Sequence, residues 1–191
     1  MKLEEIRKKV GYSANTKTTL KQSLRIWLAS SNNYQMSITV MPKKLFVKHL
    51  PSYYNSKRKV AQRELTKAEL KAAYERLMAI INEQVHKKAY RRFGRRLNAI
   101  AAIEGERSFK DLHLHIAIGA KPSYLTYAQL KQRIEKAIRI SGDFETDNTS
   151  YVEGKTDDSD KYRYKVDIMD SGWVDYITKE MAKNNIDNLL L

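Results

Sequence analysis

The chain has 191 residues and a formal net charge of +14 at pH 7, from 36 lysines and arginines against 22 acidic residues. That length suits one domain over residues 1–191, and 42% hydrophobic residues exclude a chain that is disordered throughout. The positive charge is typical of proteins that bind nucleic acid, of ribosomal proteins and of proteins at membrane surfaces. Because the chain has no cysteine, any metal must be held by oxygen and imidazole ligands.

The first third of the chain contains one clear strand. Residues 1–35 show only a short stretch of helical spacing in polar and mixed surroundings, and we leave them outside the predicted core. Apolar and polar residues alternate from Met36 to Val40, and the run stops at Pro42, which predicts a half-buried strand. The basic, tyrosine-containing stretch 43–63 is predicted to be a loop with short structure.

The clearest predicted helix begins at Thr66 and ends just before Gly94. Thr66 and Glu69 have the spacing of a capping box, an apolar stripe follows at helical spacing, and Gly94 suits the position just past the end. Cations crowd the end of this segment around Tyr90 and Phe93. These cations are Lys87, Lys88, Arg91, Arg92, Arg95 and Arg96.

Two strands and a second helix are predicted next. Residues 97–103 are almost continuously apolar and are bounded by Gly105, which indicates a buried central strand. Residues 112–118 have the pattern of a second strand, and the polar link between the two indicates an antiparallel hairpin. A second capping box opens a helix at Thr126, which ends near Gly142.

The last part of the chain adds a strand and a helix. Residues 143–160 are acidic and polar, which favours a solvated loop, and residues 162–168 alternate as in a strand. Ser171 can cap the helix that follows. The order of elements predicts an α+β fold with a central, mainly antiparallel sheet flanked by helices, its core covering about residues 36–186.

His113 and His115 lie two residues apart within a predicted strand. Their side chains therefore project from the same face, while Leu114 faces the opposite layer. One metal ion can be held by two such rings. The alternative is a pair of ordinary strand histidines that hydrogen-bond to their neighbours, since this spacing is common by chance.

Glu104 and Glu106 lie at the end of the facing strand, so the hairpin can bring one of them onto the histidine face. We prefer Glu104 because it closes the apolar strand, whereas Glu106 falls beyond Gly105, where the turn has begun. Two histidines and a carboxylate make an open site suited to Mg²⁺ or Mn²⁺. Either glutamate can instead be an ordinary carboxylate in a turn.

The predicted helix after Ser171 carries a tyrosine away from its apolar face. Trp173 belongs to the apolar face, whereas Tyr176 and Lys179 share another. A phenol has a pKa of about 10, so as a nucleophile at neutral pH it needs a nearby cation or metal, and Lys179 is one turn away. The alternative is a surface Tyr–Lys pair on an amphipathic helix.

Taken together, these residues resemble the HUH endonuclease superfamily, specifically the single-tyrosine rolling-circle replication initiators (Rep proteins) of plasmids and single-stranded DNA viruses. The segment 111–119, Asp-Leu-His-Leu-His-Ile-Ala-Ile-Gly, is similar to the HUH motif. The segment 176–179, Tyr-Ile-Thr-Lys, is similar to the Tyr-x-x-Lys motif and follows the histidines, as in Rep proteins. Glu104 is similar in position to the third metal ligand.

The resemblance implies an HUH/RRM-like sandwich that nicks and rejoins single-stranded DNA. A Mn²⁺ or Mg²⁺ ion on His113, His115 and Glu104 would polarise the scissile phosphate, and Tyr176 would attack it to give a 5′-phosphotyrosine and a free 3′-OH. Lys179 would assist. The implied partners are single-stranded or hairpin origin DNA and a separate or host helicase and polymerase, because the chain has no Walker motif.

The basic segment 87–96 is the first candidate for DNA contact, since cations with interleaved aromatics suit single strands, and residues 43–59 with Tyr53 and Tyr54 are the second. The alternative for segment 87–96 is a solvated basic helix end whose aromatic side chains pack inward. The predicted contacts are Lys87, Lys88, Tyr90, Arg91, Arg92, Arg95 and Arg96. Two rival functions are a non-catalytic nucleic-acid-binding protein and a single-tyrosine HUH transposase. The N-terminus lacks an apolar signal core and no apolar run reaches the roughly 20 residues of a membrane span, so we expect a cytoplasmic protein without membrane partners.

Overall fold

The computed structural model describes residues 22, 25, 34–48, 60–63, 65–105, 112–146, 164–169, 172, 173, 189 and 190. Nearly all of the N-terminal segment 1–35 thus lies outside the described residues. The described elements are, in chain order, β1 (Met36–Val40), β2 (Leu45–Lys48), β3 (Val60–Arg63), α3 (Lys67–His86), α4 (Lys88–Phe93), β4 (Ala99–Glu104), β5 (His113–Ile118), α5 (Tyr127–Ser141), β6 (Tyr164–Ile168) and β7 (Leu189–Leu190).

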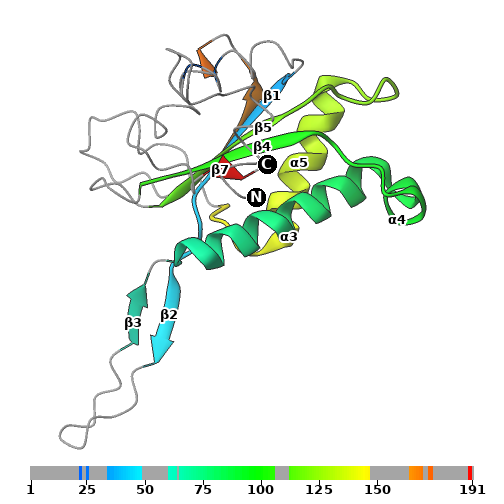
Figure 1. Cartoon of the computed structure of the whole chain (residues 1–191). Helices are drawn as coiled ribbons and strands as arrows, with labels where there is room; N and C mark the ends of the chain where they lie inside the picture. Colours follow the sequence, from blue (N-terminus) through cyan, green and yellow to red (C-terminus); the bar gives the residue numbers. More distant parts are fainter. Residues whose placement is uncertain are drawn as a thin grey trace, which may run out of the picture.

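Five strands form one antiparallel sheet in the order β6-β1-β5-β4-β7, and helices α3 and α5 pack against it (Figure 1). This confirms the predicted α+β fold with a central antiparallel sheet. β4 and β5 pair antiparallel, as the predicted hairpin requires, and β1 pairs with the other edge of β5. None of the helices described is long and apolar enough to cross a bilayer.

The two faces of the sheet carry different sets of side chains, because successive side chains of a strand point to opposite sides. Ile38, Ala101, Leu114 and Ile116 belong to the hydrophobic core that the sheet shares with α3 and α5. The alternate positions of the same strands therefore lie on the face turned away from the two helices. His115 is one of these alternate positions.

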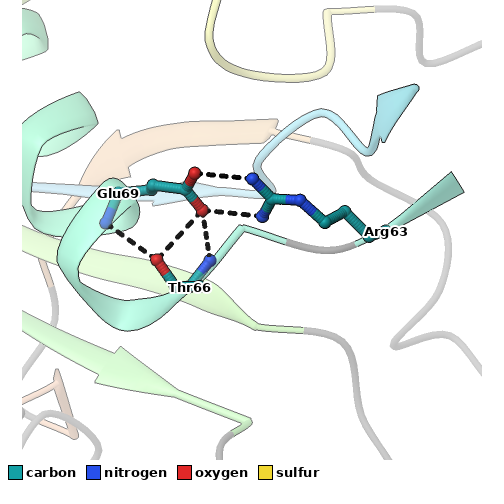
Figure 2. A network of polar contacts seen from close by, with 3 residues as sticks. All are labelled: Arg63, Thr66 and Glu69. Carbon is teal, nitrogen blue, oxygen red and sulfur yellow. Dashed lines mark hydrogen bonds and ion pairs between the residues drawn. The ribbon is translucent and has the colours of Figure 1, made fainter. Parts of the chain in front are cut away.

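Helix α3 begins with the predicted capping box. The Thr66 hydroxyl accepts a hydrogen bond from the Glu69 backbone N–H, and the Glu69 carboxylate accepts one from the Thr66 N–H (Figure 2). Arg63, the last residue of β3, donates two further hydrogen bonds to the same carboxylate, at 2.7 and 2.8 Å. The start of the helix is thereby tied to the strand before it.

The single helix predicted up to Gly94 is in fact two, because the chain breaks at Lys87. Lys87 has φ +51°, which non-glycine residues rarely adopt, and α4 starts after it. The apolar stripe ends at Val85, and α4 buries none of its residues. With no apolar face to pack beyond Val85, nothing keeps the last turns on the axis of α3. Gly94 ends α4 in the left-handed conformation, as expected of a C-cap glycine.

Three other segments refine the sequence prediction. The stretch 43–63 contains β2 and β3, which form a separate two-stranded sheet projecting beyond the start of α3 (Figure 1). The prediction of a solvated loop from residue 143 is wrong at Phe144, which is fully buried and forms a bridge with Pro42; residues 147–160 of this segment lie outside the described residues. β7 adds an edge strand beside β4 that the sequence pattern does not indicate.

Candidate metal centre

The register of β4 and β5 brings three potential metal ligands together. Glu104 lies directly opposite His113, and Ala102 lies opposite His115. Opposed residues of an antiparallel pair point to the same face, so Glu104 stands beside both histidines. Leu114 between the histidines is fully buried in the helix-covered core, which places the three side chains on the other face of the sheet.

Both imidazoles face one carboxylate oxygen. His113 Nε2 lies 3.4 Å and His115 Nε2 lies 3.5 Å from Glu104 Oε2. The two rings meet edge to face, with their centroids 4.8 Å apart. One ligand atom from each of Glu104, His113 and His115 lies within 4.8 Å of the others. These three residues could hold a metal ion and are called the metal centre below. Their grouping confirms the predicted proximity of Glu104 to the histidine pair.

The orientation of His115 is fixed from a third strand. Thr39 of β1 lies opposite His115, and its Oγ1 is 2.9 Å from His115 Nδ1. Contacts of this kind to the second ring nitrogen fix the orientation of metal-binding histidines. The sequence predicted the strand that carries Thr39 but not its register against β5, so this residue was missed.

The carboxylate of Glu104 is buried and charged. Burial by itself raises the pKa of Glu104, but the hydrogen bonds and positive charge of His113 and His115 outweigh it and lower that pKa to about 2. Its other oxygen, Oε1, is buried without a hydrogen-bond partner in the part of the chain that the structure describes. A buried anionic oxygen of this kind is costly unless a donor or a cation reaches it.

Two imidazole nitrogens and a carboxylate oxygen form a donor set that can hold a divalent metal ion. To bind a cation, the Nε2 atom of each histidine must present a lone pair. A bound cation would therefore replace the protons on Nε2 that face the Glu104 carboxylate. For His115 this leaves the ring proton on Nδ1, where the Thr39 oxygen can accept it. The centre is therefore compatible with a metal both in its donor atoms and in its tautomers.

No protein-family model, curated protein or solved structure matches this chain. What the protein does must be inferred from its own residues.

The predicted nucleophile lies outside the described residues, but its neighbourhood is partly visible. Tyr176, Lys179 and the alternative ligand Glu106 all belong to segments that the structure leaves undescribed. Trp173 is described, and its ring lies edge to face against His115 with centroids 6.3 Å apart. The segment that carries the tyrosine motif thus starts in contact with the metal centre.

The predicted DNA contacts lie at the opposite end of the sheet from the metal centre. The segment 87–96 leads into the start of β4, whereas Glu104 ends that strand, which spans about 17 Å at about 3.4 Å per residue (Figure 1). Its six cations are exposed, and Phe93 is 77% exposed. Phe93 is therefore not packed inward, in contrast to the alternative interpretation of this segment. Arg96 lies over the half-buried ring of Tyr90, and Arg91 pairs with Glu83.

Proposed function

We propose that this protein is a metal-dependent enzyme that nicks and rejoins single-stranded DNA through a 5′-phosphotyrosine, and thereby initiates rolling-circle replication. The observation that carries the proposal is the cluster of Glu104, His113 and His115 on the face of the sheet turned away from α3 and α5. The histidine pair alone is a common strand pattern. A buried carboxylate aimed at both rings, with an oxygen left unsatisfied, is not expected of an ordinary strand surface.

Each ligand has a defined task in this proposal. His113, His115 and Glu104 would hold the cation, and Thr39 would keep the His115 ring turned toward it. The bound cation would supply Lewis-acid polarisation of a phosphate oxygen. Imidazole donors favour transition metals over Mg²⁺, so Mn²⁺ is the better candidate of the two ions.

Tyr176 is the proposed nucleophile, and two facts support it. Three residues of chain span at most about 11 Å, and Trp173, three residues before Tyr176, contacts His115. The phenol would lose its proton to solvent, and its oxygen would attack phosphorus. The bond from phosphorus to the 3′ oxygen would break, and that oxygen would take up a proton from solvent and leave as a 3′-OH. Lys179, one helical turn on in sequence, would favour the phenolate or neutralise a phosphate oxygen.

The proposed substrate is single-stranded or melted hairpin DNA, since a stacked duplex would hide the phosphate. The net charge of +14 and the exposed cations of residues 87–96 favour a polyphosphate partner. A separate or host helicase and polymerase would act on the 3′ end. A transposase of the same superfamily would use the same chemistry on different DNA ends.

The test is covalent capture on a labelled single-stranded origin oligonucleotide with Mn²⁺. We expect a protein–DNA adduct that resists denaturation, that is lost on chelation, and that is lost in Tyr176→Phe and in His115→Ala. Tyr127→Phe, which removes a hydroxyl from the exposed start of α5, is the matched control and should form the adduct normally.

A non-catalytic nucleic-acid-binding protein would give the opposite result. It would bind the oligonucleotide without forming an adduct, and Tyr176→Phe would change nothing. Absence of any wild-type adduct on the oligonucleotides that the protein binds would refute the enzymatic proposal.

A further inference from the structure

A pocket of about 600 Å³ opens at the end of the sheet opposite to the metal centre. It lies between the end of α3, the chain that leads into β4 and the loop that follows β5, and Arg95, Arg96, His86, Asn98 and Tyr124 contribute to its walls. Because β4 starts and β5 ends here, the pocket and the Glu104–His113 pair lie at opposite ends of these two strands. It is therefore a distinct site, of a size that suits a small ligand.

The pocket is positively charged. Arg95 and Arg96 line it, and none of the described residues lining it carries a carboxylate. Arg91 pairs with Glu83, yet within the described part of the chain neither Arg95 nor Arg96 pairs with an acidic side chain. The two guanidinium groups are thus left available to an anion from outside, and guanidinium groups match phosphate geometry well.

A polar group on the wall also lacks a partner. His86 Nδ1 lies 2.9 Å from the Tyr124 hydroxyl, and His86 Nε2 is buried with no hydrogen bond in the described structure. Tyr124 also reaches the Val85 carbonyl, but Arg133 donates to that oxygen too. When the hydroxyl donates to Nδ1 rather than to the Val85 carbonyl, the imidazole proton lies on Nε2. Because Nε2 is buried, the ring must turn toward the pocket before a phosphate oxygen can accept this proton in a hydrogen bond.

The walls are held in place before any ligand arrives. The Gly119 N–H donates to the Asn98 carbonyl at 2.7 Å, and a Cβ on Gly119 would come within 3.0 Å of Asn98 Cβ. The Leu97 N–H donates to Oδ1 of the buried Asn82, which anchors this segment to α3. Preorganised walls reduce the entropy cost of binding.

We propose that this pocket binds a backbone phosphate of single-stranded DNA, as a second contact remote from the metal centre. The chemistry it recognises is a phosphate group, and a strand is favoured over a free nucleotide because the exposed cations and Phe93 of α4 adjoin it in sequence. The proposal rests on the nucleic-acid partner proposed above but needs neither the metal nor Tyr176.

The experiment measures binding of the full-length chain to fluorescent single-stranded oligonucleotides in the presence of a chelator. We expect Arg95→Gln to weaken binding about tenfold and to reduce the salt slope by about 0.7, the value for one phosphate contact on a single strand. Tyr124→Phe should weaken it less. Arg139→Gln removes the same charge from an exposed position of α5 outside the pocket and should change binding less than twofold.

Competitors identify the source of the phosphate. Thymidine monophosphate and inorganic phosphate should displace the oligonucleotide only at concentrations far above its own dissociation constant. If the monophosphate binds as tightly as the oligonucleotide and Arg95→Gln abolishes both, the pocket is a free-nucleotide site and the strand proposal is wrong. An equal loss of oligonucleotide affinity in Arg95→Gln and Arg139→Gln would also overturn the proposal, because the effect would then come from overall charge and not from the pocket.

The two proposals fail separately. Tyr176→Phe and His115→Ala should bind the oligonucleotide in chelator as the wild type does. A wild-type protein that forms no covalent adduct but loses binding in Arg95→Gln would contradict the enzymatic proposal and leave the pocket in place. An adduct that forms normally, together with unchanged binding in Arg95→Gln, would contradict the pocket alone.

Discussion

Thr39 orients the candidate ligand His115 without being a ligand itself. Its oxygen lies 2.9 Å from His115 Nδ1, and the other nitrogen of that ring faces Glu104. With the ring proton held on Nδ1, the lone pair of Nε2 is directed at the position between the three side chains. The contact fixes the rotation of the ring, and it is compatible with a proton on Nδ1 because the hydroxyl oxygen can accept a hydrogen bond from it.

Replacing Thr39 with valine, which has nearly the same shape, should therefore weaken Mn²⁺ binding by about tenfold while the protein stays folded. Titration calorimetry of the two proteins measures this change. Ser37→Ala is the control, because Ser37 lies on the same face of β1 opposite Ala117 rather than a histidine. If Thr39→Val binds Mn²⁺ as tightly as the wild type, the hydroxyl does not orient the ligand.

At the scale of whole elements, the two ends of α3 are stabilised by different means. The start is held by a polar network in which Glu69 accepts hydrogen bonds from Thr66 and Arg63 (Figure 2). At the end, Arg133 of α5 donates hydrogen bonds to the Gln84 and Val85 carbonyls. The chain then leaves the helix at Lys87 through a backbone conformation that suits glycine.

The network at the start gives α3 a pH-dependent contribution to stability. Hydrogen bonds from Arg63 and Thr66 lower the pKa of Glu69 from 4.5 to about 2. A carboxyl group whose pKa is depressed in the folded state stabilises the fold above its unfolded pKa, and this contribution is lost as the pH falls from about 4.5 toward about 2.

Glu69→Gln should therefore lower the thermal midpoint at neutral pH and make the midpoint less dependent on pH between about 4.5 and about 2. Differential scanning calorimetry across that range tests both effects. Glu75→Gln changes the same charge at an exposed position of the same helix and is the control. Parallel pH profiles for wild type and Glu69→Gln would show that the network does not contribute.

The break at Lys87 predicts which of two variants, Lys87→Gly or Lys87→Ala, is the more stable. In a continuous helix Lys87→Gly is less stable than Lys87→Ala by about 1 kcal/mol, because glycine is the poorer helix former. At φ +51° the order reverses, since alanine meets a steric cost that glycine avoids. Urea unfolding of the two variants decides between these cases, and a more stable alanine variant would show that α3 continues through residue 87.

At the scale of the whole molecule, much of the arrangement follows from local sequence patterns. Strict alternation from Met36 to Val40 and the apolar run before Gly105 predicted β1 and β4, and the two capping boxes marked the starts of α3 and α5. The same alternation of side chains along a strand predicted that Glu104 lies on the face that carries the two histidines. These features depend on residues close together in the chain.

The features that the sequence could not predict depend on long-range pairing. The contact of Thr39 with His115 requires the register of β1 on β5, 76 positions apart in sequence. The pocket beside His86 requires the loop after β5 to fold against the end of α3, and no periodic pattern marks that contact. The break at Lys87 is set by where burial stops, which is a property of the packed core.

The metal centre is built on the interior of the sheet, and this has a consequence for how the protein opens. β5 is paired along both edges, with β1 on one side and β4 on the other. Amide protons of such strands exchange with solvent only when the whole fold opens. His115 lies in the part of β5 that is paired on both sides, whereas His113 and Glu104 form the last pair of the β4–β5 ladder. A cation held by all three would therefore tie the end of this ladder to the interior of the sheet and would stabilise the folded state.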